Sequence, residues 1–311
     1  MATVYYGGQA LIEGVMMRGR VRATAAVRDR SGSIATRRET LPPSLYRRRV
    51  ARLPFFRGLV MLWEMLFLGT RMMLFSARVQ ASEGADTEVS KGVLGGMIAF
   101  SLAMAIGIFF VTPLFLARAG ERWVHGSLLS NLLEGVIRLA LFVGYLVLIG
   151  RMQNVQRVFQ YHGAEHKAVN AYEAGAELTP RSVQRFSLVH VRCGTAFLLW
   201  VVVLSIFVFA LIGHPPLLVG AAARVILVPV IAGLGYEVLR LGARFYHVAP
   251  VRVLMQPGLW LQALTTREPS DDQVEVAIAA LKDVLTADGV VIGADGRPGG
   301  SLRPVETVTV P

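Results

Sequence analysis

The sequence predicts a mainly α-helical, polytopic membrane protein. It has about four transmembrane helices, a small N-terminal β-hairpin and glycine-rich cytosolic region, and cytosolic amphipathic helices. Three observations predict this class: the composition, a set of long apolar runs and the placement of the basic residues. Of the 311 residues, 54% are hydrophobic and only 17% are charged, and the mean hydropathy is +0.52. Soluble domains contain about 25% charged residues, so the composition nearly excludes an ordinary cytosolic enzyme and also excludes a disordered chain.

Four stretches of the chain are long enough to cross the hydrocarbon core of a bilayer, which takes about 20 apolar residues. They run over residues 93–117, 132–150, 194–213 and 217–239. The last two are separated only by His-Pro-Pro at 214–216. We therefore expect these two helices to form an antiparallel hairpin.

A few ionisable residues lie inside these runs. Glu134 and Arg138 are four residues apart and so share one face of a helix, where we expect them to pair. Arg224 is expected to extend toward the outer membrane surface. No chain of Asp, Glu and His side chains suggests a proton relay, so a transporter is less favoured.

The basic residues fix the expected orientation. Residues 1–92 contain fifteen Lys and Arg, residues 151–193 contain six, and the part after Gly235 contains seven. With four spans, all three regions lie on one side, which the positive-inside rule makes cytoplasmic. We therefore predict a multi-pass protein of the cell inner (plasma) membrane with cytoplasmic N- and C-termini. The net charge of +11 also predicts attraction to the anionic lipids of the bilayer.

The region before the first apolar run divides into two parts. Residues 1–52 form a basic cytosolic region with a β-hairpin whose turn is expected at Ser31-Gly32. Four glycines fall within residues 7–19, which indicates either a turn-rich segment or a close approach of the backbone to a neighbour.

Residues 53–80 are expected to form an interfacial amphipathic helix. Arg57, Glu64 and Arg71 are spaced by seven residues and form a charged stripe opposite Trp and Phe side chains. The alternative is a fifth span, which would place the basic N-terminal region outside.

The remaining segments complete the predicted organisation. The transmembrane domain spans 93–239 and contains a cytosolic helical loop at 151–193. Residues 240–293 form cytosolic or interfacial helices, one of which begins with a capping box at Ser270. The Gly- and Pro-rich residues 294–311 are predicted to be a disordered tail.

The sharpest chemical motif is His-x-x-Glu-His in the cytosolic loop. On a helix, His162 and His166 lie one turn apart and can bind one divalent metal ion, with zinc as the expected ion. Glu165 lies beside them and can act as the general base of a metal-dependent hydrolase. His190 and Glu173 are the expected further ligands. Cys193 and Glu237 are additional candidates, although Cys193 is more simply explained as a small residue packed where a span begins. The alternative for the whole motif is a pair of structural histidines.

Five segments of the sequence resemble the YqhQ-like family of bacterial multi-pass membrane proteins. They are GGQALIEGVMMRG (7–19), FQYHGAEHKAVNAYE (159–173), HVRCGTAFLLW (190–200), GYEVLRL (235–241) and PGLWLQALTTREP (257–269). The resemblance implies membrane residence and a metal-dependent enzyme of unknown activity. The residues that it carries over as motif members are Glu13, Arg18, His162, Glu165, His166, Glu173, His190, Cys193 and Glu237.

Two functions follow from these patterns. The first is a metal-dependent hydrolase at the cytoplasmic face that acts on an interfacial or lipid-linked substrate, with an anionic substrate favoured by the basic surroundings. The second is a non-enzymatic membrane scaffold or biogenesis factor, whose basic surface docks a ribosome or another membrane protein. The sequence does not specify the oligomeric state.

Overall fold

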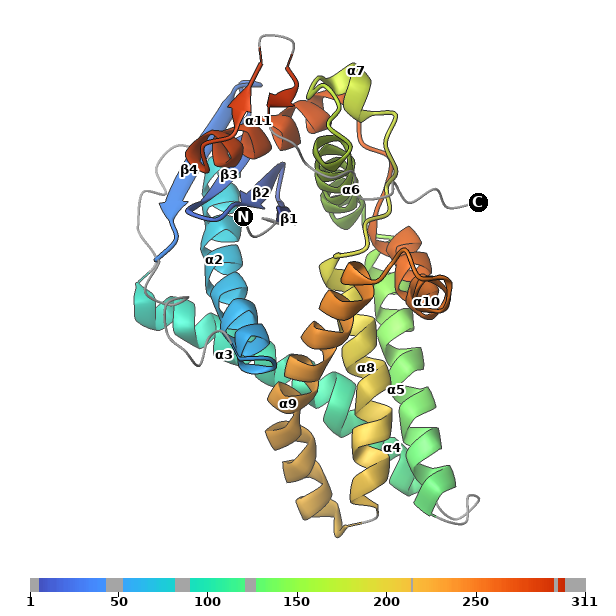
Figure 1. Cartoon of the computed structure of the whole chain (residues 1–311). Helices are drawn as coiled ribbons and strands as arrows, with labels where there is room; N and C mark the ends of the chain where they lie inside the picture. Colours follow the sequence, from blue (N-terminus) through green and yellow to red (C-terminus); the bar gives the residue numbers. More distant parts are fainter. Residues whose placement is uncertain are drawn as a thin grey trace.

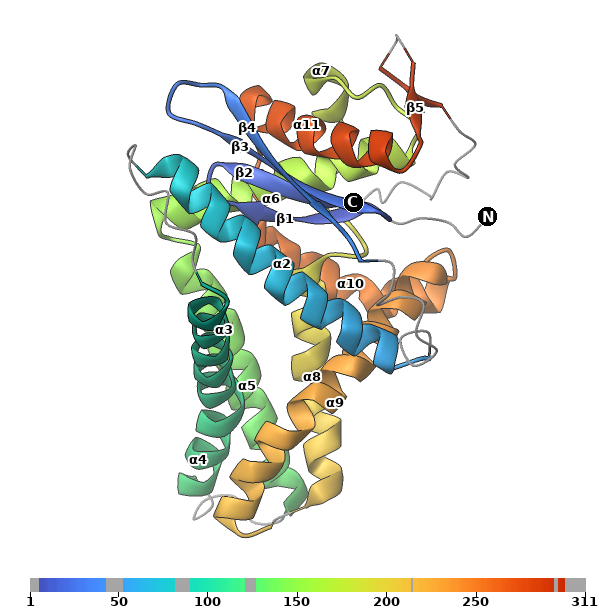
Figure 2. The ribbon, with the colours of Figure 1, turned by 90° about the vertical axis from the view of Figure 1, so that its left-hand side faces the viewer.

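The computed structural model of the chain describes residues 6–42, 53–81, 90–120, 127–213, 215–293 and 296–299. It confirms the mainly helical, polytopic fold. Long apolar helices form a bundle, and an antiparallel sheet with its covering helices lies at one end of that bundle (Figures 1 and 2). The hairpin connection at Gly213, Pro215 and Pro216 lies at the opposite end.

The N-terminal region is a four-stranded meander rather than a single hairpin. Its strands are paired in the order β1 (Gly7–Leu11), β2 (Gly14–Arg18), β3 (Arg22–Arg28) and β4 (Ile34–Thr40).

The predicted turn at Ser31-Gly32 is confirmed as the β3–β4 connection. There, Asp29 accepts hydrogen bonds from the amides of Ser31 and Ser33, and Gly32 has φ +89°. The glycine-rich segment forms β1 and β2, and a Cβ on Gly8 would lie 2.1 Å from the carbonyl oxygen of Met16. The expected close approach therefore occurs within the sheet.

Alternating residues of the sheet face two separate cores. Val15, Met17 and Ala26 pack with α6 (Gln153–Glu173) and α11 (Asp271–Ala287). Met16 and Val27 point the other way and pack with α2 (Phe56–Gln80). Successive side chains of a strand point to opposite faces, so the two central strands, β2 and β3, are buried between two helical layers. Gly8 of the edge strand β1 is thereby held beside α6, where its backbone amide donates a hydrogen bond to Glu165.

Asp283 of α11 ties that helix to the sheet. Its carboxylate accepts a hydrogen bond of 2.6 Å from Thr24 and pairs with Arg22 and Arg38. Burial alone would raise the pKa of this carboxyl, but the Thr24 and Arg38 contacts and the positive charge of Arg22 lower it below its usual value. A lowered pKa stabilises the fold above the unfolded-state value of about 3.9, and this contribution is lost as the pH falls through the folded-state value.

We expect Asp283→Asn to reduce the free energy of unfolding by about 1–2 kcal/mol at pH 7, because the contacts are partly exposed to solvent. Unfolding midpoints of the wild type and the variant, measured between pH 3 and 7, check this prediction. The difference between the two proteins should shrink below about pH 4. A difference that stays constant with pH would contradict it.

Among the residues that the structure describes, five helices are long and apolar enough to cross a membrane, which indicates a membrane protein. The first is α2. The others are α3 (Lys91–Ile106), which continues through the π-helical turn η2 (Gly107–Val111) into α4 (Thr112–Ala119), together with α5 (Ser127–Ile149), α8 (Gly194–Ile212) and α9 (Leu217–Arg244).

Helix α2 is the segment predicted to be interfacial. It is less apolar than the other candidate spans of the described residues. One side of α2 lies against the sheet, and its first turn contacts α9 through Arg57 and Glu237. Its interfacial position stays a prediction.

The helices predicted for residues 151–193 and 240–293 are present, while their cytosolic position stays a prediction. The loop between α5 and α8 contains α6 and the short α7 (Pro180–Val183), and the C-terminal part contains α10 (Ala249–Thr265) and α11. The capping box is confirmed by the hydrogen bond from the Ser270 amide to Gln273.

The predicted disordered tail is wrong at its start. There, β6 (Pro298–Gly299) pairs with β5 (Val291–Ile292) because Gly296, at φ +74°, turns the chain back. The rest of that tail lies outside the described residues.

A buried charge cluster joins three helices inside the bundle. Glu134 accepts a hydrogen bond of 2.5 Å from Arg138 and one of 2.6 Å from Arg224. Both guanidinium groups also lie over the ring of Phe209. The expected Glu134–Arg138 pair is confirmed. The expectation that Arg224 extends outward is wrong, because it is only 1% exposed and turns inward to share the carboxylate.

Candidate metal centre

Helix α6 places the three residues of the His-x-x-Glu-His motif on one side. The imidazole rings of His162 and His166, one turn apart, have centroids separated by 4.4 Å. His166 and Glu165 are buried, and His162 is nearly so, with its side chain 15% exposed. These polar side chains lie at the end of the apolar bundle next to the sheet. Their partners come from β1, the end of α10 and the segment that leads into α8.

Backbone carbonyl groups fix the orientation of both rings. The Nδ1 atom of His162 donates to the carbonyl oxygen of Thr265 at 2.9 Å, and that of His166 donates to Leu188 at 2.6 Å. A carbonyl can only accept, so each Nδ1 carries the proton in the neutral ring. Each Nε2 atom is then left with the lone pair that a metal ion needs.

Cys193 brings a third ligand atom to these two nitrogens. It is the N-cap of α8, and its Sγ atom lies 3.4 Å from His162 Nε2 and 3.0 Å from the Thr195 hydroxyl. One ligand atom from each of His162, His166 and Cys193 lies within 4.8 Å of the others. The residue that sequence reasoning treated mainly as a packing residue therefore belongs to the cluster.

Glu165 completes the arrangement from the same helix. Its Oε2 atom lies 4.0 Å from His162 Nε2 and 3.7 Å from His166 Nε2. Its Oε1 atom accepts a hydrogen bond of 2.9 Å from the amide of Gly8 in β1. A Cβ on Gly8 would lie 3.1 Å from the Glu165 side chain. The edge of the sheet therefore positions the carboxylate, and a glycine permits this approach.

The two further ligands expected from the sequence lie beside the cluster and next to each other. His190 Nε2 lies 3.5 Å from one carboxylate oxygen of Glu173, while Arg192 contacts the other oxygen and donates to His190 Nε2 at 3.3 Å. The ring of His190 lies 5.7 Å from that of His166. Its backbone amide and carbonyl are both bonded to the side chain of Gln262. This arrangement lets His190 and Glu173 support the cluster, while Cys193 holds the position closest to the two histidines.

The remaining motif residues connect the sheet, α2 and the bundle. Glu237 pairs with Arg57 and accepts a hydrogen bond of 3.0 Å from the Phe55 amide. Glu13, at φ 52°, pairs with Arg157 of α6 at 2.5 Å. Arg18 pairs with Glu64 of α2 at 2.9 Å. The structure therefore does not bring these three residues together at the histidines.

The pKa values of His162 and Cys193 depend on each other. Burial alone would lower the pKa of His162, but the charge and hydrogen bond of Cys193, together with Glu165, raise it to about 9. Burial would raise the pKa of the Cys193 thiol, but the charges and hydrogen bonds of His162 and His166 lower it well below its usual value. The position of Cys193 at a helix N-terminus also favours the thiolate. The cluster thus holds the sulfur in the form that binds metal ions.

Sequence reasoning missed the residues that orient this cluster. Gly8, Gln262 and Thr265 act through the backbone or through an amide side chain. No metal-ligand pattern includes such residues. They do lie inside segments 7–19 and 257–269, two of the segments that carry the family resemblance. That resemblance is the sequence signal that could have identified them.

Comparison with known proteins places the chain among bacterial relatives. Residues 53–287 match the family model described as "Protein of unknown function (DUF1385)". The chain is 34% identical over 297 residues to the uncharacterized protein YqhQ of Bacillus subtilis (strain 168), covering 92% of this chain and 93% of the relative. No solved structure matches the chain.

Proposed function

Because this chain belongs to the DUF1385 family of proteins of unknown function, its chemistry must be argued from its own residues, and we propose that it is a metal-dependent hydrolase of the inner membrane. In this proposal, His162, His166 and Cys193 hold a zinc ion and Glu165 is the general base. The observation that carries it is the convergence of the three ligand atoms.

The ligand set suits zinc. In a tetrahedral site with bonds of 2.0–2.3 Å, two ligand atoms lie about 3.5 Å apart. The distance from His162 Nε2 to Cys193 Sγ, 3.4 Å, is close to this value, and the three ligand atoms all lie within 4.8 Å of one another. A soft sulfur atom together with two imidazoles favours zinc over magnesium or calcium. When bound, the ion supplies a Lewis acid that polarises a substrate oxygen and activates water.

The protein groups have separate tasks in this proposal. The carbonyl groups of Thr265 and Leu188 hold the two imidazoles in the tautomer that leaves Nε2 unprotonated. The Gly8 amide holds Glu165 by one oxygen. The other oxygen faces both Nε2 atoms and can accept a proton from the attacking water.

The position of the cluster suggests the class of substrate. The sheet, α6 and α11 lie at one end of the apolar bundle (Figure 2), which we take to be the cytoplasmic end because the basic residues gather there. A site at this level reaches molecules that lie at the membrane surface. We therefore propose an interfacial or lipid-linked substrate, with an anionic one favoured by the basic surroundings.

One observation favours the second candidate, a membrane scaffold with a structural metal ion. The side chains of Glu165 and His166 are only 6% and 1% exposed, and structural zinc sites are closed whereas catalytic sites keep one position open. In that case Glu165 would be the fourth ligand. The basic cytosolic surface would then dock a ribosome or another membrane protein.

The substitution Glu165→Gln tests the catalytic role. A general base is lost while the two histidines and the cysteine remain, so we expect the purified variant to keep its zinc. The same variant should fail to restore function in cells that lack the protein. Zinc content and complementation are the two measurements.

The surface variant Glu275→Gln serves as the control, because its side chain is 57% exposed and its ion pair is with Arg28 of β3 rather than with a residue of the metal cluster. It should keep both zinc and function. Complementation by Glu165→Gln would reject the catalytic role, and simultaneous loss of zinc would favour the scaffold.

A further inference from the structure

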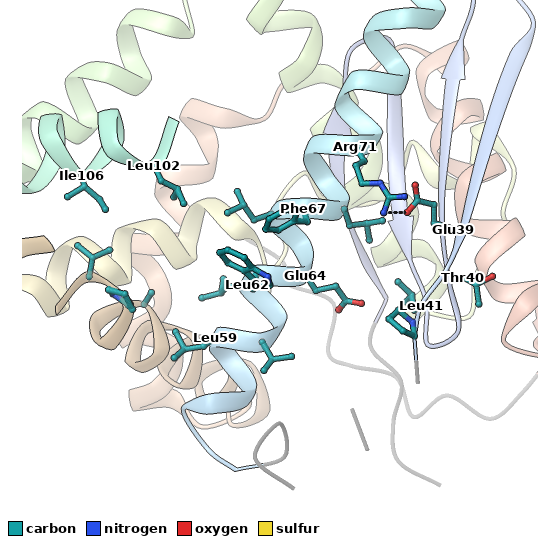
Figure 3. Close-up of a pocket in the computed structure, with 18 of the residues that line it drawn as sticks. Glu39, Thr40, Leu41, Leu59, Leu62, Glu64, Phe67, Arg71, Leu102 and Ile106 are labelled. Atoms are coloured by element: carbon teal, nitrogen blue, oxygen red, sulfur yellow. Dashed lines mark ion pairs between the residues drawn. The ribbon is translucent and has the colours of Figure 1, made fainter. Parts of the chain in front are cut away.

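A cavity of about 800 Å³ lies between α2, α3, α9 and the end of β4 (Figure 3). It is separate from the metal centre, because none of the residues that line it belongs to the cluster. Leu62 and Phe67 of α2 form one wall. Leu102 and Ile106 of α3 and Val228 and Ala232 of α9 form the others.

The three helices around the cavity all meet the length and composition criteria for a membrane span. The cavity therefore opens among apolar helices, of which α3 and α9 are expected to contact hydrocarbon and α2 the membrane interface. Its size falls within the range of about 300–1,000 Å³ typical of small-molecule sites. An α-helix about 10 Å wide would fill the same volume with only about 10 Å of its length. The space therefore suits a flexible chain better than a partner helix.

The cavity has a polar end at the edge of the sheet. Figure 3 shows Arg71 and Glu39 at this end, while Leu102 and Ile106 lie on the opposite side. Arg71 is paired with Glu39 at 3.0 Å, yet its side chain is 48% exposed. An exposed guanidinium keeps hydrogen-bond donors available for a phosphate group.

The charges near this end favour an anion. Glu39 is also 3.3 Å from Arg37, and Glu64 pairs with Arg18. The described residues at this end therefore include three guanidinium groups and two carboxylates, which gives a net charge of +1. They are Arg18, Arg37, Arg71, Glu39 and Glu64.

We propose that this cavity binds one anionic membrane phospholipid. An acyl chain lies among Leu62, Phe67 and Ala232, and the phosphate pairs with Arg71. The apolar lining determines that the ligand carries a hydrocarbon chain, and the excess guanidinium determines that its headgroup is anionic. This lipid site does not depend on the metal centre.

Native mass spectrometry of the full-length protein tests the proposal. Detergent-solubilised protein is equilibrated with phosphatidylglycerol or with phosphatidylethanolamine, and the retained lipid is counted. The wild type should retain one phosphatidylglycerol in preference to phosphatidylethanolamine. Arg71→Gln should reduce that preference about fivefold, which is the effect of one basic side chain near a lipid phosphate. Arg244→Gln, an arginine of α9 that does not line the cavity, should leave it unchanged.

A second pair of variants tests the acyl-chain position. Ala232→Trp, or the milder Val228→Phe, fills the cavity and should reduce the retention of both lipids. Ala222→Trp adds the same bulk on α9 at an exposed position that does not line the cavity, so retention should stay normal. Glycerol phosphate, which carries no acyl chain, should not displace the bound lipid.

Three outcomes would overturn the proposal. The first is equal retention of lipid by the wild type and both filled variants. The second is displacement of the lipid by glycerol phosphate, which would indicate a headgroup site without a chain. The third is a change of oligomeric mass in the filled variants without loss of lipid, which would indicate that a second protein chain occupies the cavity.

Discussion

We expect the wild-type protein to bind one zinc ion, and we expect the variants His162→Ala and Cys193→Ser each to lose it. Removing a group that only orients a ligand reduces metal affinity about 10–100-fold. Removing a ligand itself should reduce the zinc affinity by more than this. His162 and Cys193 come from α6 and from the start of α8, and their ligand atoms lie 3.4 Å apart. Elemental analysis and competition with a zinc chelator measure the effect.

His190→Ala is the informative comparison. His190 lies beside the cluster, with its Nε2 accepting from Arg192, so the variant should keep zinc with an affinity reduced only about 10–100-fold. If His190→Ala lost zinc completely while Cys193→Ser retained it, the ligand set expected from the sequence would be correct and the ligand set with Cys193 would be wrong. A wild-type protein without any bound divalent metal would reject the metal centre itself.

The pH dependence of zinc binding provides an independent check. The pKa of His162 is raised to about 9 in the metal-free protein. Zinc binding must therefore displace a proton from this imidazole below that pH. Zinc affinity should rise with pH up to about 9 and then level off. A lower His162 pKa in metal-free Cys193→Ser than in the metal-free wild type, measured by NMR titration, would link the raised pKa to the sulfur.

The fold class could be predicted from the sequence because each of its signals is local. Four apolar runs predicted four of the five candidate spans found in the described part of the chain, and the turn at Ser31-Gly32 was recognisable from its own residues. The strands β1 and β2 were not predicted, because their glycines are typical of turns. Gly8 is explained only by the close approach of Met16 from the neighbouring strand.

The candidate site could be predicted in part for the same reason. The spacing of His162 and His166 is a local property of one helix, and their convergence follows from helical geometry. The position of Cys193 depends on how the start of α8 packs against α6, which no spacing rule determines. Arg224 illustrates the same limit, since its partner Glu134 lies 90 residues away.

The buried charge cluster yields the other prediction with a large expected effect, Glu134→Gln. The substitution keeps the shape of the side chain and removes the only negative charge of the described cluster. Two guanidinium groups, each about 1% exposed, would then remain between α5, α8 and α9 without a counter-ion. Breaking a buried ion pair in this way costs about 3–5 kcal/mol. We therefore expect a loss of that size in the free energy of unfolding, measured by thermal or denaturant unfolding in detergent.

Two further variants separate charge from packing. Glu275→Gln breaks an exposed pair with Arg28 and should cost less than about 1 kcal/mol. In the double variant Glu134→Gln/Arg224→Leu, one of the two uncompensated charges is removed, so part of the lost stability should return. The single variant Arg224→Leu completes the cycle and gives the coupling energy between the two side chains. A coupling energy near zero would mean that Arg224 does not depend on Glu134. The helices would then be held together by apolar packing around Phe209 rather than by the shared carboxylate.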